Sequence, residues 1–371
     1  TRAMEDLSYL AILGRIFIQF VPVWIALALT FALSITFKRR LGLYGKLFDS
    51  PVGMIGFGIV MFWVFTAILA DQIVTFDPYG QFSGMKNKPL GTALANAADG
   101  DYSHFLLGGD HLARDVFSRM VMGARSVLAI APAATAFAFM VGITLGVPAG
   151  YFGGRLDTGL SFLANLVLAF PVILLFYLLV TPEIVAHKIL FFGAFLSPEA
   201  KLACATAESG GGLACFGMSI PTMMAATLFI FPIIFLSVLL NARFFTDPMK
   251  RNLYVGAVLV VGLWAYSGLA FNADPLGVWA MEPNLLNVFV SVVFVNAPTV
   301  FRIVRGIVMD LKSRDYVAAG QTRGEGAWYI MLWEILPNAR GPLIVDFCLR
   351  IGYTTILLGT LGFFGLGLSP E

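Results

Sequence analysis

Few side chains in this sequence have the types and spacing that catalytic or metal chemistry requires. The three histidines and three cysteines do not occur at metal-ligand spacings. The sequence contains no GxxxxGK phosphate-binding loop, so the chain is not expected to be an ATPase itself. His-Glu-x-x-His and paired Ser/His signatures of an intramembrane enzyme are also missing from the sequence. We therefore expect a non-enzymatic protein without a metal or cofactor of its own.

One pair of cysteines has a spacing that permits a covalent link. Cys204 and Cys215 enclose the flexible run Ser209–Gly212, in a segment that we expect outside the cytoplasm, where disulfides persist. The two residues form either a disulfide or two unpaired thiols. Cys348 lies within an apolar run and is expected to stay reduced.

A second pair carries opposite charges inside an apolar segment. Asp346 and Arg350 are one helical turn apart, the spacing at which an i,i+4 ion pair reduces the cost of inserting charge into a membrane. A direct role in binding substrate is the alternative.

The amino-acid composition indicates which class of protein contains these residues. Hydrophobic residues make up 58% of the 371 residues and charged residues only 12%, against about 25% charged in a soluble domain. The charges fall in the gaps between apolar runs, which predicts an all-α polytopic membrane protein with a single transmembrane domain. A formal net charge of +2 is too small to suggest a nucleic-acid partner.

Eight apolar runs are long enough to cross the bilayer as helices, and the fourth contains Phe170-Pro171, where we expect a kink or a re-entrant turn. The cluster Lys38-Arg39-Arg40 marks a cytoplasmic loop by the positive-inside rule, so the N-terminus is predicted outside. The predicted spans are residues 16–37, 51–70, 126–150, 158–181, 219–241, 252–273, 285–301 and 342–361, and the predicted extracytoplasmic segments are 71–125, 182–218 and 274–284.

The polar interval between the last two spans, within residues 310–340, is the most distinctive part of the chain. Its flanks are basic, which predicts a cytoplasmic position; the basic residues are Arg302, Arg305, Lys312, Arg314, Arg323 and Arg340. We expect two short helices joined by a turn at Gly324, with Pro337 ending the second. A merely solvated connector is the alternative to a docking site for a soluble partner.

This interval resembles the ATPase-coupling loop of importer-type ABC transporter permeases. The residues that carry the resemblance or its charge pattern are Asp315, Tyr316, Ala318, Ala319, Gly324, Glu325, Leu336, Pro337 and Asn338. In the family an acidic residue stands at the position of Ala318, and Asp315 or Glu325 is a candidate electrostatic substitute. Glu334 stands near the place where a basic residue is common before the family's Leu-Pro-Asn.

Two further segments resemble the C-type permease branch of dipeptide, oligopeptide and nickel ABC importers. Gly108–Arg119 follows a Gly-x-Asp-x-x-x-Arg-Asp-x-x-Ser-Arg pattern, with Ala113 where the family usually has Gly, and Tyr151–Asp157 is similar to a turn of that branch. The resemblance covers Lys46–Pro182 and Leu285–Pro370. The first helix and the insert Ile184–Pro283 lie outside it, and we expect the two inserted helices to form a hairpin on the lipid-facing periphery. The family's final helix is not found before the sequence stops at Glu371.

The resemblance implies a permease subunit of an ATP-driven importer for peptides or peptide-like compounds, working by alternating access in the bacterial cytoplasmic (inner) membrane. It implies a homologous second permease, two ATPase subunits that hold ATP and Mg, and an extracytoplasmic solute-binding protein as partners. A nickel or other small-solute permease is the alternative cargo assignment. A membrane scaffold and a secondary transporter are the alternatives from other classes. A secondary transporter would place ionisable residues within its spans. Between Ser126 and Thr181, however, only Arg155 and Asp157 are charged.

Overall fold

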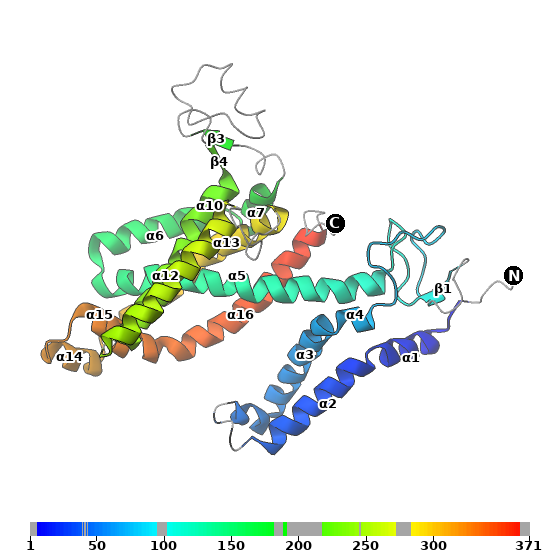
Figure 1. The fold of residues 1–371 in the computed structure, drawn as a ribbon, viewed down its shortest axis with the longest axis horizontal. Coiled ribbons are helices and arrows are strands. Elements are labelled where there is room, and N and C mark those ends of the chain that lie inside the picture. The colour runs from blue at the N-terminus through cyan, green and yellow to red at the C-terminus, as the bar shows by residue number, and fades with distance from the viewer. Residues whose placement is uncertain are drawn as a thin grey trace, which may run out of the picture. The chain divides into compact units, whose positions relative to one another are not determined.

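The structure is a computed structural model that describes residues 6–38, 40, 42, 44–94, 102–181, 188–190, 217–244, 246–271 and 283–363. Residues 1–130 form most of one compact unit and residues 131–369 form a second. Helices dominate both (Figure 1), and two short antiparallel strand pairs, β1–β2 and β3–β4, complete the described elements. In chain order they are α1 (Tyr9–Gln19), α2 (Val21–Thr36), η1 (Gly45–Asp49), α3 (Pro51–Ile68), α4 (Ala70–Ile73), β1 (Thr92–Ala93), β2 (His104–Phe105), α5 (Val116–Phe152), α6 (Gly154–Leu168), α7 (Val172–Val180), β3 (Lys188–Leu190), β4 (Gly217–Ser219), α10 (Ile220–Leu228), α11 (Ile230–Arg243), α12 (Pro248–Phe271), α13 (Pro283–Lys312), α14 (Asp315–Thr322), α15 (Ala327–Tyr329), η4 (Ile330–Ile335) and α16 (Leu336–Phe363).

Helices lie over most of each segment predicted to span the membrane. Five described helices are long and apolar enough to cross a bilayer, or up to seven if each of two bent pairs counts as one span. The protein is thus an all-α polytopic membrane protein, as its composition predicted.

The first predicted span is bent, which the apolar pattern did not indicate. Within residues 16–37 the chain passes from α1 to α2 with a 55° change of direction. Pro22 stands in the first turn of α2, where it cannot donate the backbone hydrogen bond that would continue α1. A helix begins where the next span was predicted to start: Ser50 caps α3 through its side chain and Pro51 is the first helical residue.

The bend expected at Phe170-Pro171 is present. Helices α6 and α7 meet there at 81°, so the segment is either a broken span or a re-entrant loop. Pro171 precedes the first residue of α7, at the place where a helix can begin without a missing hydrogen bond.

Helix α5 begins before Ser126, where the third span was predicted to start. The helix is continuous from Val116 to Phe152, about 55 Å at 1.5 Å per residue, which exceeds the hydrocarbon core of about 30 Å. No strong helix breaker occurs before Pro132, so the segment runs directly into the span.

A compact loop structure precedes α5 in the first unit. Phe76, Phe82 and Phe105 form a triangle of edge-on aromatic contacts with ring centroids 5.0–5.4 Å apart. Glycine is required beside them, because a Cβ at Gly109 would lie 1.9 Å from the backbone oxygen of Met85. The glycines of the Gly108–Arg119 pattern therefore allow two loop segments to pack closely.

The acidic residues of this pattern hold the loop and start the helix. The Asp110 carboxylate accepts the backbone N–H groups of Leu112 and Arg114 and pairs with the Arg114 side chain at 2.9 Å. Burial opposes ionisation of Asp110, but these hydrogen bonds outweigh it and lower its pKa. Asp115 is fully buried, accepts from the Ser118 backbone N–H at 2.9 Å and thereby caps α5. Burial raises the pKa of Asp115, which its hydrogen bonds only partly offset.

Ala113 has a backbone conformation that explains the glycine usual at this position. Its φ is +63°, in the left-handed region where a Cβ is unfavourable. We expect Ala113→Gly to raise the free energy of unfolding by about 1 kcal/mol, measured as a higher midpoint of heat-induced loss of monodisperse protein. Ala32→Gly, on the exposed side of α2, should lower the stability by a similar amount. A destabilised Ala113→Gly protein would contradict this account.

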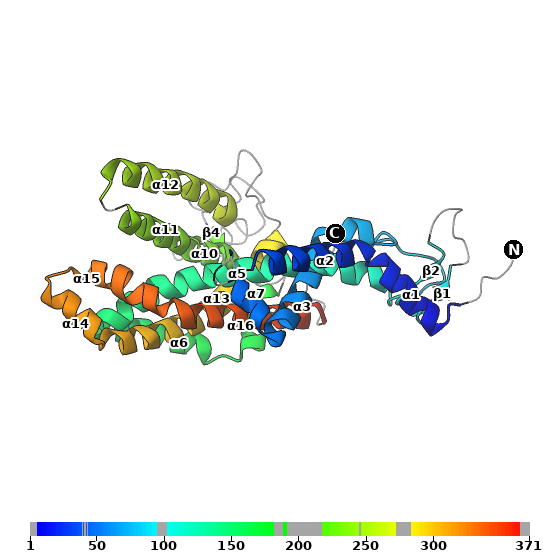
Figure 2. The same ribbon diagram turned by 90° about the horizontal axis from the view of Figure 1, so that it is seen from below.

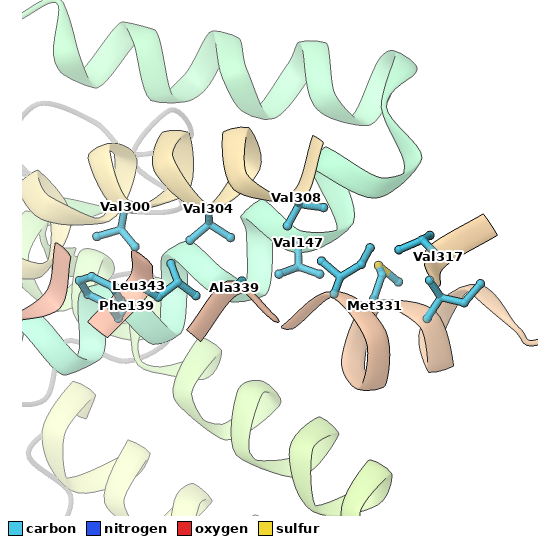
Figure 3. Close-up of a cluster of buried hydrophobic side chains, with 11 residues drawn as sticks. Phe139, Val147, Val300, Val304, Val308, Val317, Met331, Ala339 and Leu343 are labelled. Atoms are coloured by element: carbon cyan, nitrogen blue, oxygen red, sulfur yellow. The ribbon is translucent and has the colours of Figure 1, made fainter. Parts of the chain in front are cut away.

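The core of the second unit is the close packing of α5 against α13. Gly142, Gly146 and Gly150 recur every four residues on α5 and face α13, where a Cβ on Gly146 would lie 2.9 Å from the Val304 side chain. Small residues at this spacing let membrane helices approach closely. Val300, Val304 and Val308 of α13 fill the contact and are at most 1% exposed. Figure 3 shows these valines in a row that continues to Val317 and Met331.

The inserted segment forms the predicted hairpin, but its first helix is not peripheral. Helices α11 and α12 lie side by side (Figure 2). Helix α12 exposes large apolar side chains such as Val260 and Leu263, as expected of a lipid-facing helix. Helix α10 instead packs against α13, and Phe229 at its end contacts Phe137 and Phe289 in an aromatic cluster.

Several expectations concern residues outside the described part of the chain. Cys204 and Cys215, the proposed disulfide partners, belong to residues 191–216 and remain a prediction. Most of the segments 182–218 and 274–284, and residues 364–371, also lie outside the described residues.

Candidate functional site

The polar interval folds as the predicted pair of short helices, here called the 315–338 hairpin. Helix α14 begins at Asp315 and ends at Thr322, and the chain turns through Gly324 into α15. Gly324 has a φ of +80°. Its N–H donates to the Gln321 oxygen at 3.0 Å, and the Glu325 N–H donates to the Gly320 oxygen at 3.2 Å. This is a Schellman motif, in which a left-handed residue satisfies the last carbonyls of a helix.

The second short helix differs from the expected form. Three residues of α15 pass into the π-helical segment η4 and then directly into α16, so Pro337 stands in the first turn of α16 and does not end a helix. Proline lacks the N–H for an α-helical hydrogen bond and its ring crowds the carbonyl four residues earlier. The wider turns of η4, just before Pro337, relieve that crowding. The Asn338 side chain donates to the Glu334 backbone oxygen at 2.7 Å, within the same turn.

One face of the hairpin is buried against the helical core. Val317, Ile330, Met331 and Ile335 are at most 1% exposed and form one cluster with Val308 of α13 and its neighbours (Figure 3). Lys312 donates to the Tyr151 backbone oxygen and lies over the Tyr151 ring, 5.5 Å from its centroid. Because close-packed apolar contacts resist deformation, the hairpin is expected to move together with α5 and α13.

The other face is open. Asp315, Ala318 and Ala319 are exposed on α14. Asp315 lies three residues before Ala318 and therefore on the same helix face, whereas Glu325 lies 3.9 Å from the Arg323 guanidinium. Of the two proposed substitutes for the acid missing at Ala318, Asp315 is the one on this open face.

Tyr316 lies between the two faces. Its side chain packs against the buried cluster, and its Oη is buried without a hydrogen-bond partner in the described part of the chain. Burial raises the pKa of Tyr316, so the hydroxyl is neutral at physiological pH and available as a donor.

The Tyr151–Asp157 turn also contacts helix α13. Gly153 and Gly154 have positive φ values, which allow α5 to reverse directly into α6. Asp157, in the first turn of α6, accepts two hydrogen bonds from the Arg305 guanidinium, with Nη2 2.6 Å from Oδ2. A two-point contact between an arginine and a carboxylate fixes orientation as well as distance, so this pair ties α6 to α13.

Asp346 and Arg350 form the predicted ion pair. Arg350 Nε lies 2.8 Å from Asp346 Oδ2, and Arg350 Nη1 donates to Thr299 Oγ1 at 2.6 Å. The two side chains are 18% and 12% exposed. The pair thus joins α16 to α13 in addition to neutralising its own charges.

Single and double variants of the Asp346–Arg350 pair can distinguish a structural role from a role in binding substrate. We expect Arg350→Leu to destabilise the protein by about 3–5 kcal/mol, because it leaves a carboxylate unpaired in a nonpolar environment. The double variant Asp346→Leu/Arg350→Leu should recover most of the folded yield and retain transport, measured by extraction into mild detergent and by uptake. A double variant that folds normally but no longer transports would indicate a direct role in the pathway.

The glycine row on α5 and the Asp157–Arg305 pair were not among the site residues predicted from the sequence. The spacing Gly142-x-x-x-Gly146-x-x-x-Gly150 is itself a readable signal for close helix packing. The ion pair carried no such signal, since its partners are 148 residues apart.

The fold and this site define a multi-pass helical membrane protein with a short two-helix segment that presents one open face.

No family model matches the chain. It is 24% identical over 317 residues to the dipeptide transport system permease protein DppC of Haemophilus influenzae, covering 85% of this chain and 72% of that protein. The glutathione transport system permease protein GsiD of Pectobacterium atrosepticum is 25% identical over 272 residues, with coverages of 73% and 58%. A probable D,D-dipeptide transport system permease protein, DdpC of Escherichia coli, is 38% identical over 88 residues, 24% of this chain and 30% of that protein. These similarities over most of the chain confirm the resemblance to permeases of peptide ABC importers that the sequence motifs indicated.

Proposed function

We propose that this chain is the membrane-spanning permease subunit of an ATP-driven importer for peptides or peptide-like compounds. The observation that carries the proposal is similarity over most of the chain to permeases of dipeptide, di/tripeptide and glutathione transport systems. The multi-pass helical fold suits this function, and permease subunits of this kind are not themselves enzymes.

The chain would act within an ABC transporter complex. By analogy with its relatives, the partners are a homologous permease, two ATPase subunits that hold ATP and Mg, and an extracytoplasmic solute-binding protein, assembled in the bacterial cytoplasmic membrane. ATP chemistry belongs to the ATPase subunits in this proposal.

The 315–338 hairpin is the proposed contact with an ATPase subunit. Its open face, with Asp315, Ala318 and Ala319, would dock on the ATPase, while its buried face contacts α5 and α13. Closure of the ATPase dimer on ATP would move the hairpin as a rigid body and turn the helices that pack on it. The ATPase must then bind the outward-open and inward-open permease with different affinity, since only a differential affinity shifts a conformational equilibrium.

Co-purification and cross-linking test this assignment. We expect the tagged chain, extracted in mild detergent, to bring with it an ATPase and a second permease. Ala319→Cys should form a disulfide with an engineered cysteine of the ATPase, and Leu163→Cys, on an exposed part of α6 away from the hairpin, should not. Association without any ATPase, or cross-linking at Leu163 alone, would contradict the proposal.

A further inference from the structure

A groove separates the hairpin from the end of the inserted helix α11. It has a volume of about 750 Å³ and is lined by Val238, Arg243 and Thr246 on one side and by Glu325, Trp328 and Trp333 on the other. Trp328, Tyr329 and Trp333 line it and are 42–58% exposed. This aromatic wall belongs to α15 and η4, whereas Asp315 and Ala318 lie on α14.

The groove continues into a narrow apolar crevice. The crevice shares Val238, Trp328 and Leu332 with the groove and extends between Val147 of α5 and Phe235 of α11. Its volume is about 80 Å³ and its walls are almost entirely apolar. The combined space therefore has a wide, partly polar mouth and a thin apolar end.

The mouth carries a cation. Arg243, the last residue of α11, lines it and makes no ion pair with any residue that the structure describes. Lys250 pairs with Asp247 at 3.0 Å. The Arg323 guanidinium pairs with Glu334 at 2.9 Å and also lies 3.9 Å from Glu325, a carboxylate that lines the groove. A negatively charged group at the mouth would find a positive partner in Arg243.

The predicted position of the groove at the membrane surface suits its aromatic side chains and its positive charge. The basic loops after α11 and after α13 place the mouth at the cytoplasmic edge by the positive-inside rule. Trp and Tyr side chains prefer this interfacial depth, and the cytoplasmic leaflet is rich in anionic lipid.

We propose that an anionic phospholipid of the cytoplasmic leaflet binds this groove. Its phosphate lies at Arg243 in the mouth, against the aromatic wall, and an acyl chain enters the crevice between α5, α11 and η4. The lipid joins the inserted helices to the hairpin, so that lipid composition influences how firmly the hairpin is held. This inference rests on the groove alone and does not require the proposed contact between the hairpin and an ATPase.

The amount of anionic lipid that stays bound during purification tests the role of the Arg243 charge. The intact complex, purified in mild detergent, is expected to retain phosphatidylglycerol above its fraction in the source membrane. Arg243→Gln should lower that enrichment about fivefold, the factor that one basic residue contributes near an anionic membrane surface. Lys46→Gln, at the predicted cytoplasmic end of another span and remote from the groove in sequence, should leave it unchanged. Equal enrichment in wild type and Arg243→Gln would overturn the proposal.

Fluorescence quenching tests the location and does not depend on purified yield. In liposomes, brominated phosphatidylglycerol should quench tryptophan emission more than brominated phosphatidylcholine at the same mole fraction. The variant Trp328→Phe/Trp333→Phe should lose this difference, and Trp63→Phe, on α3 of the first unit, should keep it. Equal quenching by the two lipids would overturn the proposal. So would a difference that appears only after the ATPase is stripped away, because the groove would then be covered by protein in the complex.

Discussion

Gly324→Val should uncouple ATP hydrolysis from transport while leaving the spanning helices inserted. Gly324 has a φ of +80° at the centre of the Schellman motif that ends α14, and no atom lies within 4 Å of where a Cβ would be. The cost is therefore one of backbone conformation, about 1–2 kcal/mol for an L-residue and more for a β-branched one. We expect substrate-stimulated ATP hydrolysis to fall about tenfold, since 1.36 kcal/mol corresponds to a factor of ten.

A neighbouring glycine and a milder substitution provide the controls. Gly326 has a φ of −69° and open space around it, so Gly326→Ala should behave as wild type. Gly324→Asn should be intermediate, because asparagine tolerates the left-handed region. Wild-type coupling in Gly324→Val would remove the hairpin from the mechanism and leave it a solvated connector.

The second large effect is expected at the contact between α5 and α13. In Gly146→Val the new Cβ would lie 2.9 Å from the Val304 side chain and 3.1 Å from the Phe301 backbone oxygen. Neither helix can yield locally, so the pair must separate, at a cost of about 3 kcal/mol or more. We predict a strongly reduced yield of monodisperse protein and a lowered melting temperature.

Gly123→Ala, on the same helix, is the matched control because nothing lies within 4 Å of its Cβ position. It should insert and purify as wild type does. If Gly146→Val were equally harmless, the close packing of α5 on α13 would be wrong, and with it the path from the hairpin to the spanning helices.

The sequence predicted those features of the fold that depend on local composition. Apolar runs indicated the helices, and Gly324 indicated a turn with unusual backbone angles, which its positive φ confirms. The Asp346–Arg350 pair followed from i,i+4 spacing alone and is also confirmed. These features could be predicted because each depends on residues within a few positions of one another.

Features that depend on distant contacts or on helix continuity were predicted less well. Nothing in its composition showed that α10 would pack against α13 and not against lipid, since both environments favour apolar side chains. Pro337 was expected to end a helix, yet the preceding π-helical turns let the helix continue through it. The strain at Ala113 required the loop around it to be known, because alanine ordinarily avoids a φ of +63°.

Uptake by the reconstituted complex tests the central proposal most directly. The chain and its partner subunits are placed in liposomes with ATP on the ATPase side and the solute-binding protein with a labelled dipeptide on the other. We predict accumulation of the dipeptide that requires ATP hydrolysis, is lost when the ATPase is inactivated, and is not matched by nickel. Dipeptide accumulation that proceeds without ATP, or that follows an imposed ion gradient instead, would contradict the assignment of this chain as an ATP-driven peptide permease.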